Sequence, residues 1–395
     1  MRCDPPTTRI LCAAVALTLL GAAICQQLNH RRPRCGQWRQ PYAALHARIL
    51  AGAAPPRYLF HLCDEGLADC AVGAASALYL AVATGRALFT GKFSYHHFFN
   101  DSHSGHLEAA YGRPTIDWRV PSELIDEQFP DAEHVMLLGF NQPRITAAKI
   151  ASIYSQAAGP ATSVVMFSNA GITHRMLNVS SVRQHLTNLG VTPGNAFGCA
   201  FEFLFRPHPL SKDLFADEVA IFSKPRKLPV IAVHVRTGDA AFDTAPQAGD
   251  PDPAALFAGI LSCVRDIKQH ARAAQAAIYI ISDSAAVRQS LARQFPDDVV
   301  VANTNVPLQH SGPFQKNAPI TFKGLRTAAT EFWLFGEADY HVAFRWSGYG
   351  RAAAARVAAQ IRMHLYALND YSAPSTCTPE REVDVAALGA MRPGI

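Results

Sequence analysis

The sequence predicts an α/β protein of two domains, each built on a doubly wound parallel sheet, that face each other across a cleft. The clearest signal is the apolar, β-branched run Val230–Val235. It stops at the charged, glycine-containing turn Arg236–Asp239 and is typical of a buried parallel strand. Strand-like and helical segments alternate along both halves of the chain, as they do in α/β folds. With 395 residues, 49% of them hydrophobic and 17% charged, the chain can bury two cores of ordinary size.

In the N-terminal half, a βαβ unit follows a first helix. The sequence predicts a helix over 42–50, a strand over 58–62, an alanine-rich helix over 70–84 and a strand over 87–89. We interpret residues 91–130, which are rich in histidine and aromatic residues, as a long insertion of the kind that often carries function.

The alternation is clearer in the C-terminal half. The predicted strands are 230–235, 277–281, 299–301 and 340–344, and the predicted helices are 254–273, 326–337 and 351–367. A further helix is expected after the capping turn Ser282–Ser284.

The chain divides near Ser223–Lys227, where the two halves join. We expect a cytosolic tail over 1–9, an apolar segment over 10–25, a stem over 26–40, an N-terminal domain over 41–222, a C-terminal domain over 223–372 and a tail over 373–395.

The uncharged run Ile10–Cys25 is either a cleaved signal peptide or an uncleaved signal anchor. No small-x-small cleavage site follows it, which favours the anchor. The arginines of the stem outnumber Arg2 and Arg9, which argues against a cytosolic N-terminus. Both interpretations send the rest of the chain into the secretory lumen.

Cysteine usage agrees with an oxidising compartment. Six of the nine cysteines lie beyond the apolar run, an even number that permits three disulfides among fifteen pairings. They are Cys35, Cys63, Cys70, Cys199, Cys263 and Cys377. Their wide spacing is unlike a zinc site. The sequons Asn100–Ser102 and Asn178–Ser180 fit the same route.

Three loops follow strands of the C-terminal half, at 234–239, 282–284 and 345–350. Because the carboxyl ends of parallel strands meet at one edge, these loops are expected to line a single nucleotide pocket. Arg236 offers a planar fork of donors to a phosphate, although it could instead pair with Asp239. Asp283 is a candidate for holding a ribose or base, with helix N-capping as the alternative.

The turn Ser347-Gly348-Tyr349-Gly350 has the strongest anion-binding chemistry. It directly precedes a helix, and its glycines let backbone N–H groups approach a phosphate at the helix N-terminus. A plain helix cap would also explain Ser347.

Several other functions lack their motifs. There is no phosphate loop of the Walker type, no dinucleotide glycine fingerprint and no G-x-S-x-G elbow. The net charge of +5 is small and its basic residues are scattered, so nucleic-acid binding is not expected. Asp250-Pro251-Asp252 has the D-x-D spacing of metal-dependent sugar transferases but lies in a proline-punctuated turn. The spacing of His96, His97, His103 and His106 fits no standard metal site.

Several segments resemble plant-type xyloglucan fucosyltransferases. Cys35-Gly36 followed by Tyr42 resembles their stem, and Tyr58–Phe89 resembles their strand–turn–helix carrying GLGNR. The longest match, 185–207, contains Ala196-Phe197-Gly198-Cys199 and resembles the family's segment L..MGL.P..AFGC...FLF.P. His234–Asp239 resembles the H-x-R-x-G-D motif of the wider superfamily of α1,2-, α1,6- and protein O-fucosyltransferases. Ser347–Gly350 resembles the family's later donor loop, and Glu331 falls in the preceding helix.

The resemblance implies a GT-B-like enzyme of the Golgi membrane, a single-pass type II protein anchored through 10–25, that moves fucose from GDP-fucose to a glycan hydroxyl with inversion. It implies that Arg236 contacts the diphosphate of the donor. We expect Arg236 and Asp239 to be the catalytic residues, with a carboxylate or histidine of 91–130 as the alternative general base. No metal is expected, because an arginine and a helix N-terminus can replace the cation. The expected donor-binding residues are His234, Arg236, Gly238, Asp283, Ser347, Gly348, Tyr349 and Gly350. The chain departs from the family at Asp69 and Cys70, which stand in place of an asparagine and an arginine.

Two alternatives stay open: a GT-B transferase for another nucleotide sugar, and a non-catalytic lectin-like or scaffold protein. The sequence leaves the acceptor, the general base and the oligomeric state undetermined.

Overall fold

The computed structural model describes most of both predicted domains. The described residues are 35–63, 66–90, 107, 111–113, 115–119, 132–136, 146–168, 171–208, 215–223, 226–237, 257–303, 322–357 and 364–379. The predicted apolar segment 10–25, the turn at 250–252, the histidines at 96–106, and Gly238 and Asp239 lie outside these ranges.

The N-terminal half is built on a four-stranded parallel sheet in the order β2-β1-β5-β4. Its strands are β1 (Tyr58–Leu62), β2 (Ala87–Thr90), β4 (Ala132–Met136) and β5 (Ser163–Phe167). The predicted strands 58–62 and 87–89 are thereby confirmed, whereas β4 and β5 were not predicted. A short antiparallel pair, β3 (Tyr111–Gly112) with β6 (Arg206–Pro207), ties part of the 91–130 segment to the end of the 185–207 segment.

The C-terminal half is built on a five-stranded parallel sheet in the order β11-β10-β7-β8-β9. Its strands are β7 (Val230–Val235), β8 (Ala277–Ser282), β9 (Val299–Val301), β10 (Tyr340–Phe344) and β11 (His364–Leu368). Every residue of β7 and β8 is buried, as the continuous apolar runs predict for central strands covered on both faces.

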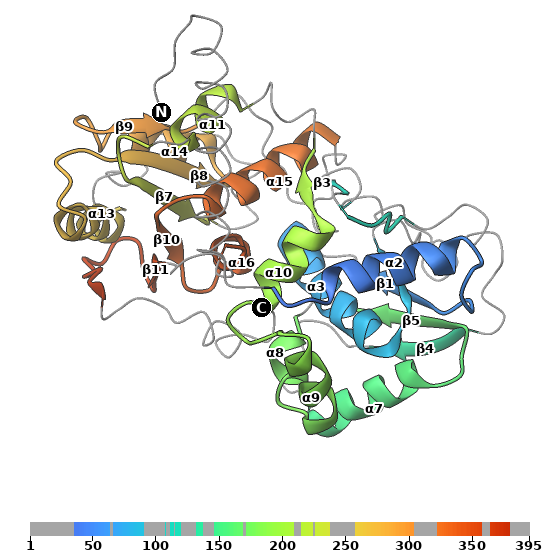
Figure 1. Cartoon of the computed structure of the whole chain (residues 1–395). Helices are drawn as coiled ribbons and strands as arrows, with labels where there is room; N and C mark the ends of the chain where they lie inside the picture. The colour runs from blue at the N-terminus through green and yellow to red at the C-terminus, as the bar shows by residue number, and fades with distance from the viewer. Residues whose placement is uncertain are drawn as a thin grey trace, which may run out of the picture.

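Helices cover both sheets (Figure 1). In the N-terminal half they are α2 (Arg39–Leu50), α3 (Leu67–Thr84), α7 (Ala147–Ala158), α8 (Thr173–Met176), α9 (Ser180–Asn188) and α10 (Ala196–Leu204). In the C-terminal half they are α13 (Ala258–His270), α14 (Ala285–Ala292), α15 (Phe322–Gly336) and α16 (Gly348–Ala355). Helix α11 (Ala216–Phe222) follows α10 in the chain but packs on the C-terminal half, where Phe222 contacts Tyr279 of β8 (Figure 1).

The prediction of one long helix over 351–367 is wrong. Helix α16 ends at Ala355, and residues 364–368 form the edge strand β11, whose Leu365 and Ala367 lie beside His341 and Ala343 of β10. The alanine-rich run obscures this change because alanine fits a helix well and carries no strand periodicity.

Helix α3 is the central helix of the N-terminal half. Fifteen of its eighteen residues are buried, most of them alanines and other small side chains that let neighbouring helices approach closely. By length and hydropathy α3 alone among the described helices could cross a membrane, but its burial marks it as a core helix. It is capped at its C-terminus by Gly85, whose φ of 65° is left-handed.

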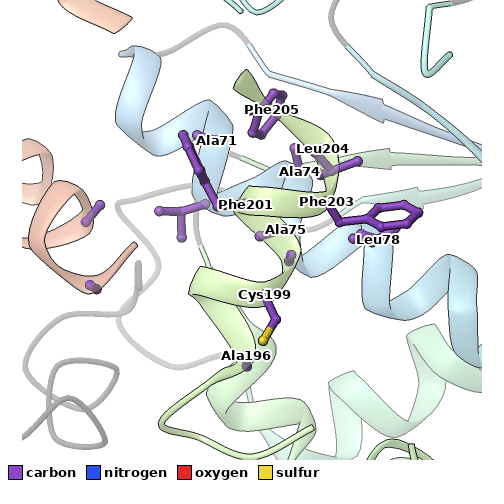
Figure 2. Close-up of a cluster of buried hydrophobic side chains, with 14 of the residues drawn as sticks. Ala71, Ala74, Ala75, Leu78, Ala196, Cys199, Phe201, Phe203, Leu204 and Phe205 are labelled. Carbon is purple, nitrogen blue, oxygen red and sulfur yellow. The ribbon is translucent and has the colours of Figure 1, made fainter. Parts of the chain in front are cut away.

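One continuous apolar core joins the two halves of the molecule. Figure 2 shows Phe201, Phe203 and Phe205 of the α10 segment packed over Ala71, Ala74, Ala75 and Leu78 of α3. Phe201 also stacks on Phe332 of α15, with ring centroids 5.2 Å apart. The alanines of α16 belong to this core as well. The 185–207 segment that carries the strongest resemblance is therefore part of the contact between the halves.

Three disulfides fix the ends of the described chain and one internal loop. Cys35 pairs with Cys199, Cys63 with Cys70, and Cys263 with Cys377. The first ties the stem to α10; Gly36, with a φ of 77°, lies so close to Leu189 that a side chain there would collide with its carbonyl oxygen. The last ties residue 377 to α13. All six cysteines beyond the apolar run are thus paired, in the three disulfides that their even number permits.

Candidate functional site

The carboxyl ends of three adjacent strands bring the candidate residues together. Val235 of β7 lies beside Ser282 of β8, so Arg236 and Asp283 leave the sheet as neighbours. On the other side, Ala343 of β10 lies beside His234, so the turn that leads into α16 emerges next to Arg236. This is the common edge that the sequence predicted.

Arg236 is held by Asp283. Its guanidinium Nη1 lies 2.9 Å from Oδ2 of Asp283, and the Arg236 side chain is 25% exposed while the Asp283 side chain is only 4% exposed. Asp283 also accepts hydrogen bonds from the backbone N–H of Thr237, at 2.9 Å, and from its hydroxyl, at 2.7 Å. The buried carboxylate therefore fixes the turn after β7 and the orientation of the partly exposed arginine.

Asp283 does not cap the helix that follows it. Ser284 is the N-cap of α14, and its hydroxyl accepts from the backbone N–H of Val287 at 3.4 Å. The expectation that the 282–284 turn caps a helix is confirmed, but the capping side chain is Ser284, while Asp283 is committed to Arg236 and Thr237.

Tyr371 supports the same turn from β11's side and was not singled out in the sequence. Its hydroxyl accepts a hydrogen bond from the backbone N–H of Arg236 at 2.9 Å and donates to the carbonyl of His234 at 3.3 Å. Burial raises the pKa of the Tyr371 hydroxyl well above its ordinary value, so it stays protonated. Nothing in the local sequence signals this role, because the contact spans 135 residues.

His234 lies buried beneath the edge. Its ring packs against Tyr349 and Phe335, with centroids 5.5 and 6.2 Å away. Burial lowers the pKa of the imidazole to about 4, with the nearby Arg236 acting in the same direction and Asp283 opposing it. His234 is therefore a neutral packing and polar group near pH 7. Its Nδ1 has no hydrogen-bond partner within the part of the chain that the structure describes.

Helix α16 begins directly above His234. Ser347 is its N-cap, and the hydroxyl oxygen faces the backbone N–H of Gly350 at 3.5 Å. A Cβ on Gly350 would lie 2.7 Å from Nδ1 of His234 and 3.1 Å from the Cβ of Ala343. The glycine thus lets the first turn of α16 approach the sheet closely, and the positive end of the helix dipole points to the same edge as Arg236.

A buried ion pair supports the carboxyl end of β8. Arg288 of α14 bonds the carbonyl of Ser282 through Nε at 2.9 Å, and its Nη2 lies 3.0 Å from Oε2 of Glu331 on α15. Both side chains are almost fully buried. Burial alone would lower the pKa of Arg288, but Glu331 raises it above the ordinary value. Glu331 was placed in this helix by the resemblance, whereas Arg288 was missed.

Two predicted site residues, Gly238 and Asp239, lie outside the described ranges, and so does the alternative pairing of Arg236 with Asp239. The other candidates, His234, Arg236, Asp283 and Ser347–Gly350, are gathered at one sheet edge. Within the ranges that the structure covers, no group of three or more His, Cys, Asp or Glu side chains is placed to hold a metal ion.

The edge therefore combines one partly exposed guanidinium with one helix N-terminus, above a neutral histidine. Such a combination suits a phosphate group, because the planar fork of an arginine and the backbone N–H groups of a helix start both donate to phosphate oxygens.

Comparison with solved structures supports the architecture. A mutant of Arabidopsis thaliana FUT1 in complex with GDP matches with a TM-score of 0.58 and 13% sequence identity, over 87% of this chain and 82% of that chain. The fucosyltransferase NodZ from Bradyrhizobium matches with a TM-score of 0.43, 15% identity and 75% and 91% coverage. POFUT1 in complex with GDP matches with a TM-score of 0.38, 10% identity and 80% and 99% coverage.

No protein-family model and no curated protein matches the sequence. At 13% identity, the match with FUT1 shows a shared fold. The fold is the GT-B type, with two Rossmann-like halves, and the expected fold class is confirmed.

Proposed function

We propose that the protein is a glycosyltransferase and, more specifically, a fucosyltransferase that transfers fucose from GDP-fucose to a glycan hydroxyl with inversion. The observation that carries the proposal is the meeting of Arg236 with the N-terminus of α16 at one sheet edge. It occurs in a fold shared with FUT1, a protein whose structure holds GDP. The resemblance of 185–207 and His234–Asp239 to fucosyltransferases points to the same donor.

In this proposal the edge stabilises the departing diphosphate. Negative charge develops on the leaving group as the bond to the sugar breaks, and preorganised donors aimed at that charge lower the barrier. Arg236, held in place by Asp283, and the first-turn N–H groups of α16 at Gly348 and Tyr349 would supply these donors. With these positive groups present, the proposed reaction needs no metal ion and no other cofactor.

The remaining assignments belong to the same proposal. The domain over 223–372 binds the nucleotide sugar and the domain over 41–222 faces the acceptor. Asp239 remains the candidate for a catalytic carboxylate. Residues 10–25 anchor the protein as a type II protein of the Golgi membrane, with the catalytic domain in the lumen. The three disulfides and the exposed Asn178 of the second sequon support a secretory route. The xyloglucan-type acceptor stays one option among glycan acceptors.

Arg236→Ala tests the proposal. We expect the variant to lose fucose transfer from GDP-fucose by at least about a hundredfold, as loss of a charge-stabilising donor does in other enzymes. Transfer to a glycan acceptor array is measured with labelled GDP-fucose, and circular dichroism confirms that the variant is folded. Arg236→Lys should recover only part of the activity, because lysine lacks the planar fork.

Arg293→Ala is the matched control, since Arg293 is exposed near the end of α14 and bonds only Ser290 of its own helix among the described contacts. Near-normal transfer by a folded Arg236→Ala variant would exclude the proposed role of the arginine.

A further inference from the structure

The segment that follows β11 connects the sheet edge of the candidate site to helix α13, and we call residues 369–377 the strap. At its start, the backbone N–H of Arg345 donates a hydrogen bond to the carbonyl of Leu368, the last residue of β11, at 2.7 Å. At its end, Cys377 forms a disulfide with Cys263 of α13. The strap therefore links the turn that leads into α16 to α13 (Figure 1).

One face of α13 holds the strap, because the residues that contact it are spaced three or four apart. They are Gly259, Ser262, Cys263 and Asp266. The backbone N–H of Gly259 donates to the carbonyl of Tyr371 at 2.7 Å. The hydroxyl of Ser262 donates to the carbonyl of Ser375 at 2.8 Å, and the carboxylate of Asp266 accepts from the backbone N–H of Cys377 at 2.9 Å.

The strap lies directly on the backbone of α13 at Gly259. A Cβ on this glycine would lie 2.5 Å from the carbonyl oxygen of Ala373 and 2.8 Å from that of Tyr371. No side chain fits between the helix and the strap at this point, so any residue larger than glycine would push the two apart.

Tyr371 is the residue of the strap that reaches the candidate site. Its hydroxyl accepts a hydrogen bond from the backbone N–H of Arg236 at 2.9 Å and donates to the carbonyl of His234 at 3.3 Å. Its ring packs against Phe344, with the ring centroids 5.2 Å apart. One hydroxyl therefore bonds the backbone on both sides of Val235, the residue at which β7 ends.

We propose that Tyr371 is a positioning residue for Arg236, and that the disulfide between Cys263 and Cys377 acts on the donor site through it. A strap that is fastened to α13 keeps the hydroxyl beside the turn, so the arginine is already in place when a diphosphate arrives, and preorganisation of this kind lowers the cost of binding. Loosening the strap lets the turn move and weakens diphosphate binding. The inference rests on the proposed function, because it takes Arg236 to bind the diphosphate of a nucleotide.

Tyr371→Phe tests the positioning role, because it removes the hydroxyl and retains the ring. In calorimetric titrations with GDP, we expect the variant to bind about five- to tenfold more weakly than the wild type, the effect of one lost hydrogen bond, at unchanged stoichiometry. With GDP-fucose as substrate, the donor KM should rise by a similar factor. A merely structural role would instead reduce the amount of active protein and lower kcat at unchanged KM.

Tyr154→Phe is the matched control for this substitution. It removes a phenol hydroxyl from α7, in the other half of the molecule, and should leave both the GDP affinity and the donor KM unchanged.

Replacement of Cys263 and Cys377 by serine tests the role of the disulfide. We expect GDP affinity to fall by no more than it does in Tyr371→Phe. In a protein that already carries Tyr371→Phe, the same two serines should cause no further loss, because the disulfide acts through the hydroxyl. Replacement of Cys35 and Cys199 by serine removes a disulfide from the N-terminal half and should leave GDP affinity unchanged.

Gly259→Ala loosens the strap in a second way, with the disulfide intact, and it replaces the serine variant if that protein does not fold. It should weaken GDP binding to the same extent, and again only while the Tyr371 hydroxyl is present.

The outcomes separate this inference from the proposed function. If the wild type binds GDP and Tyr371→Phe binds it as tightly, or lowers kcat at unchanged donor KM, the inference is wrong while the proposed function stands. It is also wrong if loosening the strap leaves GDP affinity unchanged, or weakens it equally with and without the Tyr371 hydroxyl. If the wild type does not bind GDP, both fail.

Discussion

Arg236 owes its orientation to two residues that lie far from it in the chain. The carboxylate of Asp283 pairs with the guanidinium of Arg236, and the hydroxyl of Tyr371 accepts a hydrogen bond from the backbone N–H of Arg236. The arginine and its place at a strand end were predictable from the apolar run and the glycine turn that follows it. Its partners were not, because a side chain's hydrogen bond across 47 or 135 residues leaves no local pattern.

Gly350 is the residue where backbone approach matters most. Replacing it with alanine would drive a Cβ to 2.7 Å from the ring of His234, which is itself packed between Tyr349 and Phe335. We expect Gly350→Ala to lower the free energy of unfolding by about 1–3 kcal/mol, the range for overpacking a buried site, despite the better helix propensity of alanine. Chemical denaturation measures the change.

Gly194→Ala is the control for this substitution, because a Cβ there meets nothing within 4 Å. Its stability should stay within about 0.5 kcal/mol of the wild type. If Gly350→Ala proved as stable as Gly194→Ala, the close contact between α16 and His234 would be excluded.

At the scale of elements, α14, α15 and the end of β8 are joined by the buried pair of Arg288 and Glu331. Arg288 also donates to the carbonyl of Asn303, so it connects the segment after β9 to the same cluster. This cluster supports Asp283 from beneath, since Asp283 directly follows Ser282, the residue whose carbonyl Arg288 bonds.

Glu331→Gln tests the importance of this pair. Removing one charge leaves the buried Arg288 without its counter-ion, which we expect to lower the free energy of unfolding by about 3–5 kcal/mol. The measurement is the denaturant midpoint, with the slope checked for two-state behaviour.

Asp117→Asn serves as the comparison, because the pair of Asp117 with Arg119 is about half exposed and should contribute no more than about 1 kcal/mol. Equal effects of the two substitutions would contradict the burial of the Arg288 pair.

The sequence predicted the strands of the C-terminal half closely, because β7 and β8 are continuous apolar runs and β10 is bounded by charged turns. The prediction failed where an alanine-rich composition hides the spacing of apolar residues that separates helices from strands. The alanines after Gly350 suggested one helix over 351–367, and the edge strand β11 was lost within it. In the N-terminal half, β5 and the short helices α8 and α9 give signals too brief to separate from loops.

At the scale of the molecule, the two halves share one apolar core, formed by α3, α10, α15 and α16. This junction places Asp69 of the first half against Gly348 of the second. The sequence predicted two facing domains but not which residues meet between them, since contacts between separate domains depend on how whole helices and sheets dock. The sequence therefore showed that the loop at 66–70 is altered, and the structure shows that its Asp69 lies beside Gly348.

We propose that the edge formed by Arg236 and the start of α16 is a site for a nucleotide diphosphate. Calorimetric titration of the wild-type protein with GDP, with UDP alongside, measures this most directly. We expect one GDP to bind per chain, UDP to bind more weakly, and Arg236→Ala to abolish GDP binding without unfolding the protein. Absence of binding for both nucleotides, or unchanged GDP affinity in Arg236→Ala, would contradict the claim and favour a non-catalytic role.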